Sequence, residues 1–244
     1  MHTAFVREIP AVGACAASEK REYDHLFKTL RCRDGEKLRL CDGRGVSALA
    51  EAVDRGVLVR ERTEHQRDRV RVHLYAAQPK AARLDDILKP AAEAGAVSIT
   101  PLVCRYSVAR RETPSERWHT LLVEGCKQSG NPFLPDLRPA LTPDEAVREI
   151  QRLGQQAFFG KPDGVLWNGE GLTPTGDGTL ELAWLVGPEG GFAPEEEALF
   201  LDNGMPGLGL GPYIMRLETA ALAGMVYLGQ TARRKLEERE SCAR

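Results

Sequence analysis

The chain has 244 residues, 42% of them hydrophobic and 28% charged, which is an ordinary composition for a globular protein of one large or two medium domains. No apolar run reaches the 18 residues of a membrane span, and the start lacks the basic-then-apolar order of a signal peptide, so we expect a cytoplasmic protein without a membrane segment. The net charge is −2, but residues 1–80 carry 16 Lys and Arg against 12 Asp and Glu, which hints that this part meets a polyanion.

The N-terminal part has the pattern of short β-strands. Apolar runs at 38–40, 46–48 and 57–59 are separated by Asp-Gly and Gly-rich turns, and alternation at 70–74 continues the pattern. Closely spaced short strands of this kind predict a small barrel or a compact sheet.

After residue 80 the pattern alternates between helix and strand. Thr142 to Glu145 form a capping box with proline at the first helical position, and Gly154 supplies the stop. Alternating elements predict a parallel sheet covered on both faces, and we place the boundary between two domains near residues 76–82. The expected helices are 84–92, around 118–122, 143–153, 194–201 and 217–235, and the expected strands are 97–103, 164–167 and 182–186.

Two glycine-rich loops follow predicted strands in the C-terminal part. The first is LVGPEGGF (185–192), and the second, about twenty residues later, is LGPYIMRLETAA (210–221). Glycines at the carboxyl end of a parallel strand let a ligand lie against the backbone, although an isolated G-P-x-G-G is as often a simple tight turn. Neither loop has the spacing of a dinucleotide fingerprint or a P-loop, which disfavours a nucleotide-binding oxidoreductase. The six scattered cysteines contain no C-x-x-C pair, so we expect neither a metal site nor disulfides.

This pair of loops resembles the cofactor loops of SPOUT methyltransferases, and within that class the bacterial RsmE family of small-subunit ribosomal RNA (uracil-N3)-methyltransferases. The segment from His25 (HLFKTLRCRDGEKLRLCDGRG) is similar to the opening of that family's PUA-like domain, and EGCKQSGNPFLPDLRP (124–139) is similar to its central motif. The resemblance therefore covers most of the chain.

The resemblance implies an α/β fold: a SPOUT-type parallel sheet with a C-terminal deep trefoil knot (77–244), preceded by a small PUA-like RNA-binding β-barrel (1–76). It implies S-adenosylmethionine as cofactor, a homodimer, and N3 of a uridine in 16S rRNA as the methyl acceptor. Arg216 and Glu189 are the expected catalytic residues, and His25, Arg31, Arg105, Lys127 and Gln128 the expected RNA contacts. The expected cofactor contacts are Leu166, Trp167, Leu185, Val186, Gly187, Pro188, Glu189, Gly190, Gly191, Leu208, Gly209, Leu210, Gly211, Ile214, Met215 and Arg216.

Several of these residues have a plain structural alternative. Arg216 could form an ion pair with Glu218 or Glu189, and Glu189 could brace its own loop. His25 and Trp167 could simply pack in the interior, whereas Cys126 is expected to be a buried apolar residue because no partner base is in sight.

The chain also departs from the family pattern. Tyr213 and Asn131 replace arginines, Lys127 replaces an acidic residue, and Lys89–Pro90 replaces a Gln-Lys pair. We therefore expect secure cofactor binding with slow but real methyl transfer; the alternative is a catalytically weak or inactive RNA-binding homologue that retains the cofactor pocket.

Overall fold

The structure, a computed structural model, describes residues 1–17, 20–78, 84–107 and 113–242. The chain divides into two compact units. The first joins Met1–Arg67 to Thr120–Leu134, and the second joins Asp68–His119 to Pro135–Arg244.

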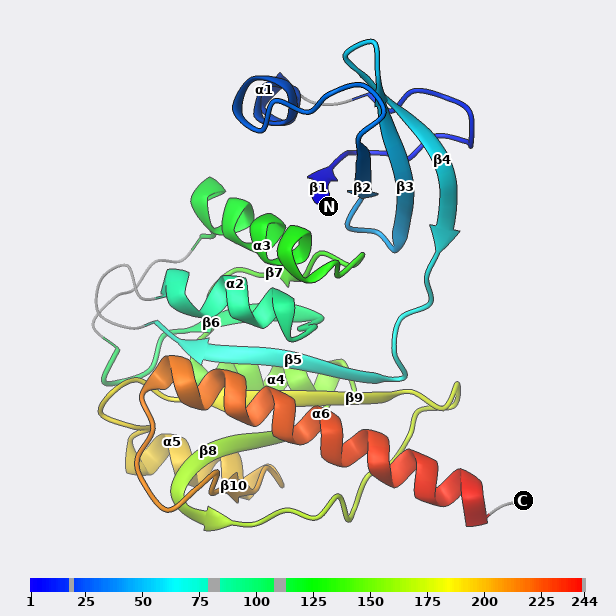
Figure 1. Cartoon of the computed structure of the whole chain (residues 1–244). Helices are drawn as coiled ribbons and strands as arrows, with labels where there is room; N and C mark the ends of the chain where they lie inside the picture. The colour runs from blue at the N-terminus through cyan, green and yellow to red at the C-terminus, as the bar shows by residue number, and fades with distance from the viewer. Residues whose placement is uncertain (18–19, 79–83, 108–112, 243–244) are drawn as a thin grey trace. The chain divides into compact units, whose positions relative to one another are not determined.

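The first unit is built on a four-stranded sheet in the order β1-β2-β3-β4, in which β1 is parallel to β2 and the other pairs are antiparallel (Figure 1). Asp54 and Arg55 both have positive φ in the tight turn between β3 and β4, as a two-residue hairpin of matching twist requires. The elements are β1 (His2–Phe5), α1 (Lys20–Asp24), the π-helix η1 (His25–Thr29), β2 (Lys37–Cys41), β3 (Val46–Val53) and β4 (Gly56–Glu64).

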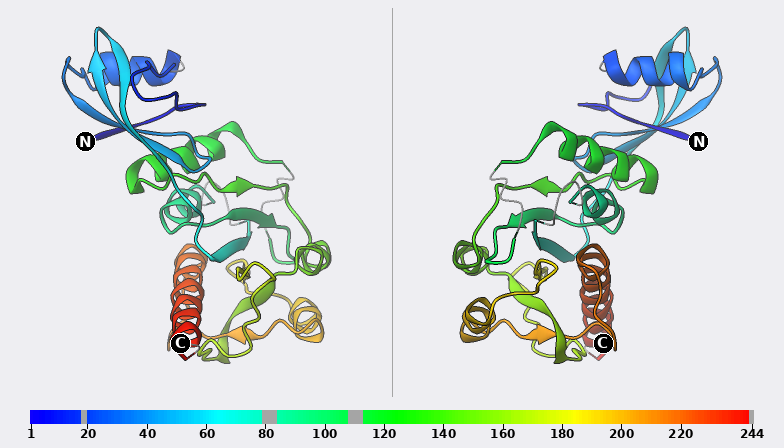
Figure 2. Two further views of the ribbon diagram at one scale, coloured as in Figure 1. Left: turned by 90° about the vertical axis from the view of Figure 1, so that its right-hand side faces the viewer. Right: turned by 90° about the vertical axis from the view of Figure 1, so that its left-hand side faces the viewer.

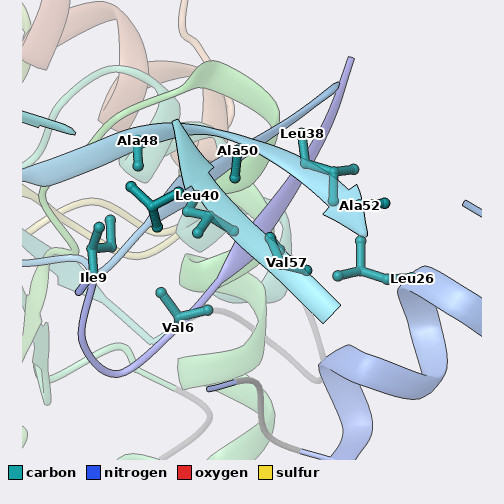
Figure 3. Packing of buried hydrophobic residues seen from close by; sticks show 11 residues of the cluster. Val6, Ile9, Leu26, Leu38, Leu40, Ala48, Ala50, Ala52 and Val57 are labelled. Atoms are coloured by element: carbon teal, nitrogen blue, oxygen red, sulfur yellow. The ribbon is translucent and has the colours of Figure 1, made fainter. Parts of the chain in front are cut away.

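Alternating strand residues form the core of this unit (Figure 3). Leu38 and Leu40 are fully buried on one face of β2, while Lys37 and Arg39 on the other face are exposed. Leu26 of η1 packs into the same cluster. The short strands predicted from the sequence are confirmed.

The second unit is an all-parallel six-stranded sheet in the order β10-β8-β9-β5-β6-β7. Figure 2 shows α2 and α6 on one face of this sheet and α4 and α5 on the other, as the sequence predicted. The strands are β5 (Val70–Ala77), β6 (Ser98–Leu102), β7 (Asp136–Leu137), β8 (Gln156–Val165), β9 (Leu180–Val186) and β10 (Gly207–Leu208). The helices are α2 (Asp85–Glu93), α4 (Pro143–Arg152), α5 (Pro194–Asp202) and α6 (Leu217–Cys242), while α3 (Glu116–Ser129) spans the division between the units.

Local sequence signals account for several helix ends. Thr142 caps α4 by accepting from the backbone N–H of Glu145 at 3.4 Å, and its own N–H donates to the Glu145 carboxylate at 2.8 Å. Gly154, with φ of +63°, follows the end of that helix. Pro90 lies inside α2, whose Ile87 and Leu88 are nevertheless fully buried.

Two sequence predictions need correction. The strand expected at 164–167 is β8, which runs from Gln156 to Val165; Gly160, Pro162 and Gly164 obscured it because they are poor strand residues. The boundary expected at 76/77 falls at the end of β5, which pairs with β6 and β9 and therefore belongs to the second sheet. The division lies at 67/68 instead, and residues 79–83 of the expected boundary lie outside the described part.

Candidate active site

A pocket of about 430 Å³ opens at the carboxyl end of the central strands of the second unit. This is where open α/β sheets bind ligands, and the volume suits a small organic molecule. Its walls come from the ends of β8 and β9, the loop after β10 and the start of α6. The lining residues are Gly160, Lys161, Pro162, Val186, Gly187, Pro188, Glu189, Gly190, Gly191, Leu208, Leu210, Gly211, Tyr213, Ile214, Met215, Arg216, Leu217 and Ala220.

The loop after β9 presents its backbone to this pocket. The N–H of Gly191 donates to the carbonyl of Pro188 at 2.8 Å, and the turn so closed places Gly191 at φ of +74°, where a side chain would be strained. The three atoms nearest to a Cβ built on Gly190 all belong to the side chain of Tyr106, the nearest at 3.5 Å. The loop therefore leaves room for a ligand against its main chain.

The second loop is fixed against the end of β8 by close contacts among three glycines. The N–H of Gly209 donates to the carbonyl of Val165 at 3.2 Å. A Cβ added to Gly164 would lie 2.6 Å from the carbonyl oxygen of Gly207, and one added to Gly209 would lie 2.7 Å from that of Gly164. Only glycine permits this approach, which sets the position of the loop that follows.

A bulge in β8 brings a cation to the pocket. Gly207 and Leu208 are neighbours in β10, yet they pair with Phe159 and Val165 of β8. The β8 residues that lie between Phe159 and Val165 therefore bulge out of the regular pairing. Lys161 lies in that segment and lines the pocket, with its ammonium 3.1 Å from the Glu197 carboxylate. This hydrogen bond raises the pKa of Lys161 and keeps it charged.

The rim beside Gly190 is held by a buried carboxylate. Glu196, in the first turn of α5, accepts from the backbone N–H of Arg105 at 2.7 Å and from that of Ala193 at 2.8 Å. These bonds tie the loop after β6 to the loop after β9, and Tyr106 lies against Gly190 as a result. Glu196 is 8% exposed. Because a buried carboxylate without hydrogen-bond donors is costly, these two backbone N–H groups stabilise the rim.

Arg216 is the exposed cation among the expected catalytic residues. It lines the pocket just before α6 begins, together with Glu189. Within the described ranges Arg216 makes no ion pair, so the alternative of a bridge to Glu218 or Glu189 is not realised. Tyr213 and Ile214 beside it are 85% and 84% exposed, and a ligand or partner could cover them.

Most of the expected cofactor residues meet at this pocket, and four do not line it. Leu166 is 83% exposed, and Leu185 is fully buried within the sheet. Trp167 is partly buried and packs on Phe158 with ring centroids 4.6 Å apart. Gly209 instead anchors the second glycine-rich loop through its hydrogen bond to Val165. The sequence reading missed Gly160, Lys161, Pro162, Tyr213, Leu217 and Ala220.

The expected RNA contacts are scattered. Arg105 forms an ion pair with Glu195, whose hydrogen bond raises the pKa of the Arg105 guanidinium. In the first unit, Lys127 lies 2.6 Å from Glu22, and both side chains are largely buried. The other three are His25, partly buried at the start of η1, Arg31, exposed with φ of +55°, and Gln128, exposed on α3.

We searched the described ranges for metal-binding clusters and for reactive cysteines. No group of three or more His, Cys, Asp or Glu there could hold a metal ion, and no helix is long and apolar enough to cross a membrane. All six cysteines are free. Burial raises the pKa of the Cys126 thiol to about 11, which agrees with its expected role as a buried apolar residue.

Known RNA methyltransferases are similar to this chain over the region that forms the pocket. A model of the RNA methyltransferase domain matches residues 66–229, which include the whole pocket. The ribosomal RNA small subunit methyltransferase E of Mycobacterium tuberculosis is 30% identical over 240 residues, which cover 92% of this chain and 90% of that protein.

Solved structures share the fold. Ribosomal RNA small subunit methyltransferase E from Neisseria gonorrhoeae, bound to S-adenosyl methionine, has a TM-score of 0.80 at 22% identity, covering 94% of this chain and 97% of that one. A methyltransferase from Legionella pneumophila in complex with the bound cofactor SAM has a TM-score of 0.78 at 25% identity, covering 93% and 96%.

Proposed function

This chain belongs to the RNA methyltransferase family, and on that premise we propose that it transfers a methyl group from S-adenosylmethionine to N3 of a uridine in 16S rRNA of the small ribosomal subunit. The observation that carries the proposal is the pocket formed by two glycine-rich loops at the carboxyl end of a parallel sheet, with the exposed Arg216 in its lining. The acceptor places the reaction in the cytoplasm, where small subunits assemble.

The pocket fits S-adenosylmethionine in its chemistry. The loop 187–191 offers bare backbone N–H and C=O groups that can read the polar edges of an adenine ring or an amino acid. Leu208, Leu210, Ile214 and Met215 supply apolar surface for the remainder. When bound, the cofactor supplies a sulfonium methyl group that is already activated for transfer.

The protein's own task is then to position the base and favour loss of its proton. Uracil N3–H is a weak acid, so a nearby cation stabilises the anionic nucleophile. Arg216 is suited to this role because its guanidinium forms no ion pair with the described residues and its fork matches planar acceptors. Lys161 also lines the pocket, but its ammonium is paired with Glu197. Glu189 is the carboxylate within the cofactor loop itself.

The finer architecture belongs to the same proposal. The strand order β10-β8-β9-β5, with α6 returning over β5 and β9, supports a C-terminal trefoil knot. Exposed apolar side chains near the pocket support a homodimer that covers them, since single-chain proteins seldom expose such groups together. They are Val165, Leu166, Tyr213 and Ile214. We assign the first unit to a PUA-like RNA-binding role.

Label transfer tests the proposal. Small subunits lacking the methyl group are incubated with labelled S-adenosylmethionine and either the wild-type protein or Arg216→Ala. We expect transfer by the wild type and a loss of about a hundredfold in the variant. Tight cofactor binding without transfer to any RNA would favour the inactive homologue instead, and tight binding of NAD(P) in place of S-adenosylmethionine would contradict the assignment.

A further inference from the structure

In the first unit, the segment after α3 folds onto the turn between β2 and β3. The N–H of Gly45 donates to the carbonyl of Pro132 at 2.9 Å, and the N–H of Leu134 donates to that of Gly43 at 2.9 Å. Between these bonds, Arg44 and Phe133 form an isolated antiparallel bridge. These contacts join residues 43–45 to residues 132–134, so that the two segments form one continuous surface.

Three arginines converge on this surface. The guanidinium carbon of Arg67 lies 4.4 Å from the centroid of the Phe133 ring, in cation–π geometry. A Cβ built on Gly130 would lie 2.5 Å from Nη1 of Arg39, so the absence of a side chain there leaves room for the guanidinium. Arg44 is exposed on the turn itself. We call Arg39, Arg44, Arg67 and Phe133 the arginine cluster.

The charges of Arg39 and Arg44 are available to a ligand. In the described part of the chain, neither Arg39 nor Arg44 forms an ion pair. The nearby carboxylate of Asp42 accepts from the backbone N–H groups of Arg44 and Val46, at 2.8 and 3.0 Å, and so closes its own turn. Phe133 holds Arg67 on its ring face, which reduces the freedom that the guanidinium loses on binding.

Three other cations of the same unit are already neutralised by ion pairs. Lys127, an expected RNA contact, is paired with Glu22 and only 18% exposed. Lys28 lies 2.8 Å from Asp24, and Arg60 lies 2.8 Å from Glu51. A polyanion therefore meets more usable positive charge at the arginine cluster than at the helix where the sequence placed it.

We propose that the arginine cluster is a binding site for the phosphate backbone of the RNA substrate. Guanidinium groups bind phosphate oxygens bidentately, and backbone contacts of this kind position an RNA without reading its sequence. The inference rests on the proposed function, since it requires an RNA substrate, and it adds the surface of the first unit that holds that RNA.

The test compares two double variants, each of which removes two positive charges. Arg39→Gln with Arg44→Gln removes two cations of the cluster. Arg33→Gln with Arg55→Asn removes two exposed, unpaired cations near the other end of the β3–β4 hairpin, and Asn suits the φ of +59° at residue 55. Affinity for unmethylated small subunits is measured across a salt series, with melting temperatures as a check on folding.

We expect the cluster variant to lower the slope of log K against log salt by about 2, because each phosphate contact contributes roughly 1. Its KM for subunits should rise while kcat and cofactor affinity stay unchanged, and the control variant should match the wild type. Phe133→Leu should reproduce part of the loss by releasing Arg67. A cluster variant with wild-type salt dependence and KM, or a control variant with an equal loss, would overturn the inference. Failure of the wild type to methylate any RNA would instead refute the proposed function.

Discussion

Replacing Gly190 with valine tests whether the loop after β9 holds the cofactor. Gly190 is exposed, lies outside the left-handed region of φ and lines the pocket, so the backbone accepts a β-branched residue. The added Cβ would already be in van der Waals contact with Tyr106 at 3.5 Å, and the two methyl groups must therefore extend toward the cavity. Forcing such groups into an occupied site costs about 1–3 kcal/mol, which is roughly a 5- to 150-fold loss of affinity.

Calorimetric titration with S-adenosylmethionine measures this loss, and thermal unfolding measures the fold. We expect a melting temperature within about 2 °C of the wild type, because an exposed substitution changes stability by less than about 0.5 kcal/mol. Gly176→Val is the matched control: Gly176 is exposed, lacks a left-handed φ, has no heavy atom within 4 Å of an added Cβ, and does not line the pocket. Wild-type affinity in Gly190→Val would refute the placement of the cofactor.

Three further variants test the structure around the site. Glu196→Gln should lower the free energy of unfolding in urea by about 1–3 kcal/mol, since a charged acceptor of two amides is lost, and an unchanged value would contradict its bracing role. Gly224→Ala should destabilise by about 1–3 kcal/mol or more, because its Cβ would overlap the indole of Trp184; calorimetric melting at the wild-type temperature would disprove that packing. The hydrogen bond from His73 and the neighbouring Arg71 lower the pKa of Glu181 below 4.5, so its contribution to stability is present above pH 4.5 and is lost as the pH falls through the folded-state pKa. Glu181→Gln should therefore flatten the acid side of the stability curve in denaturant titrations, and an acid limb as steep as that of the wild type would count against this linkage.

Sequence patterns predicted those parts of the fold that depend on neighbouring residues. The capping box at Thr142 and the tight turn at Asp54 act within a few residues, and both occur as expected. The alternation of helix and strand sufficed to predict a parallel sheet with helices on both faces. The two glycine-rich loops were paired through their resemblance to known cofactor loops, and residues of both line the pocket.

What the sequence missed depends on pairing between distant segments. Lys161 enters the pocket only because β8 bulges between its two contacts with β10. The pairing of Lys127 with Glu22, 2.6 Å away but distant in the chain, was not foreseen either. The domain boundary was misplaced because strand periodicity does not reveal which sheet β5 joins. No local pattern carries this information.

Mapping the methylated nucleoside tests the central claim most directly. Small subunits lacking the modification are incubated with the wild-type protein and labelled S-adenosylmethionine, and the 16S rRNA is digested and analysed by mass spectrometry. The account predicts one labelled uridine, with the methyl group on N3, and about a hundredfold slower formation of that product by the Arg216→Ala protein. Label on another nucleotide or on another atom of uridine, or an Arg216→Ala protein as active as the wild type, would contradict it.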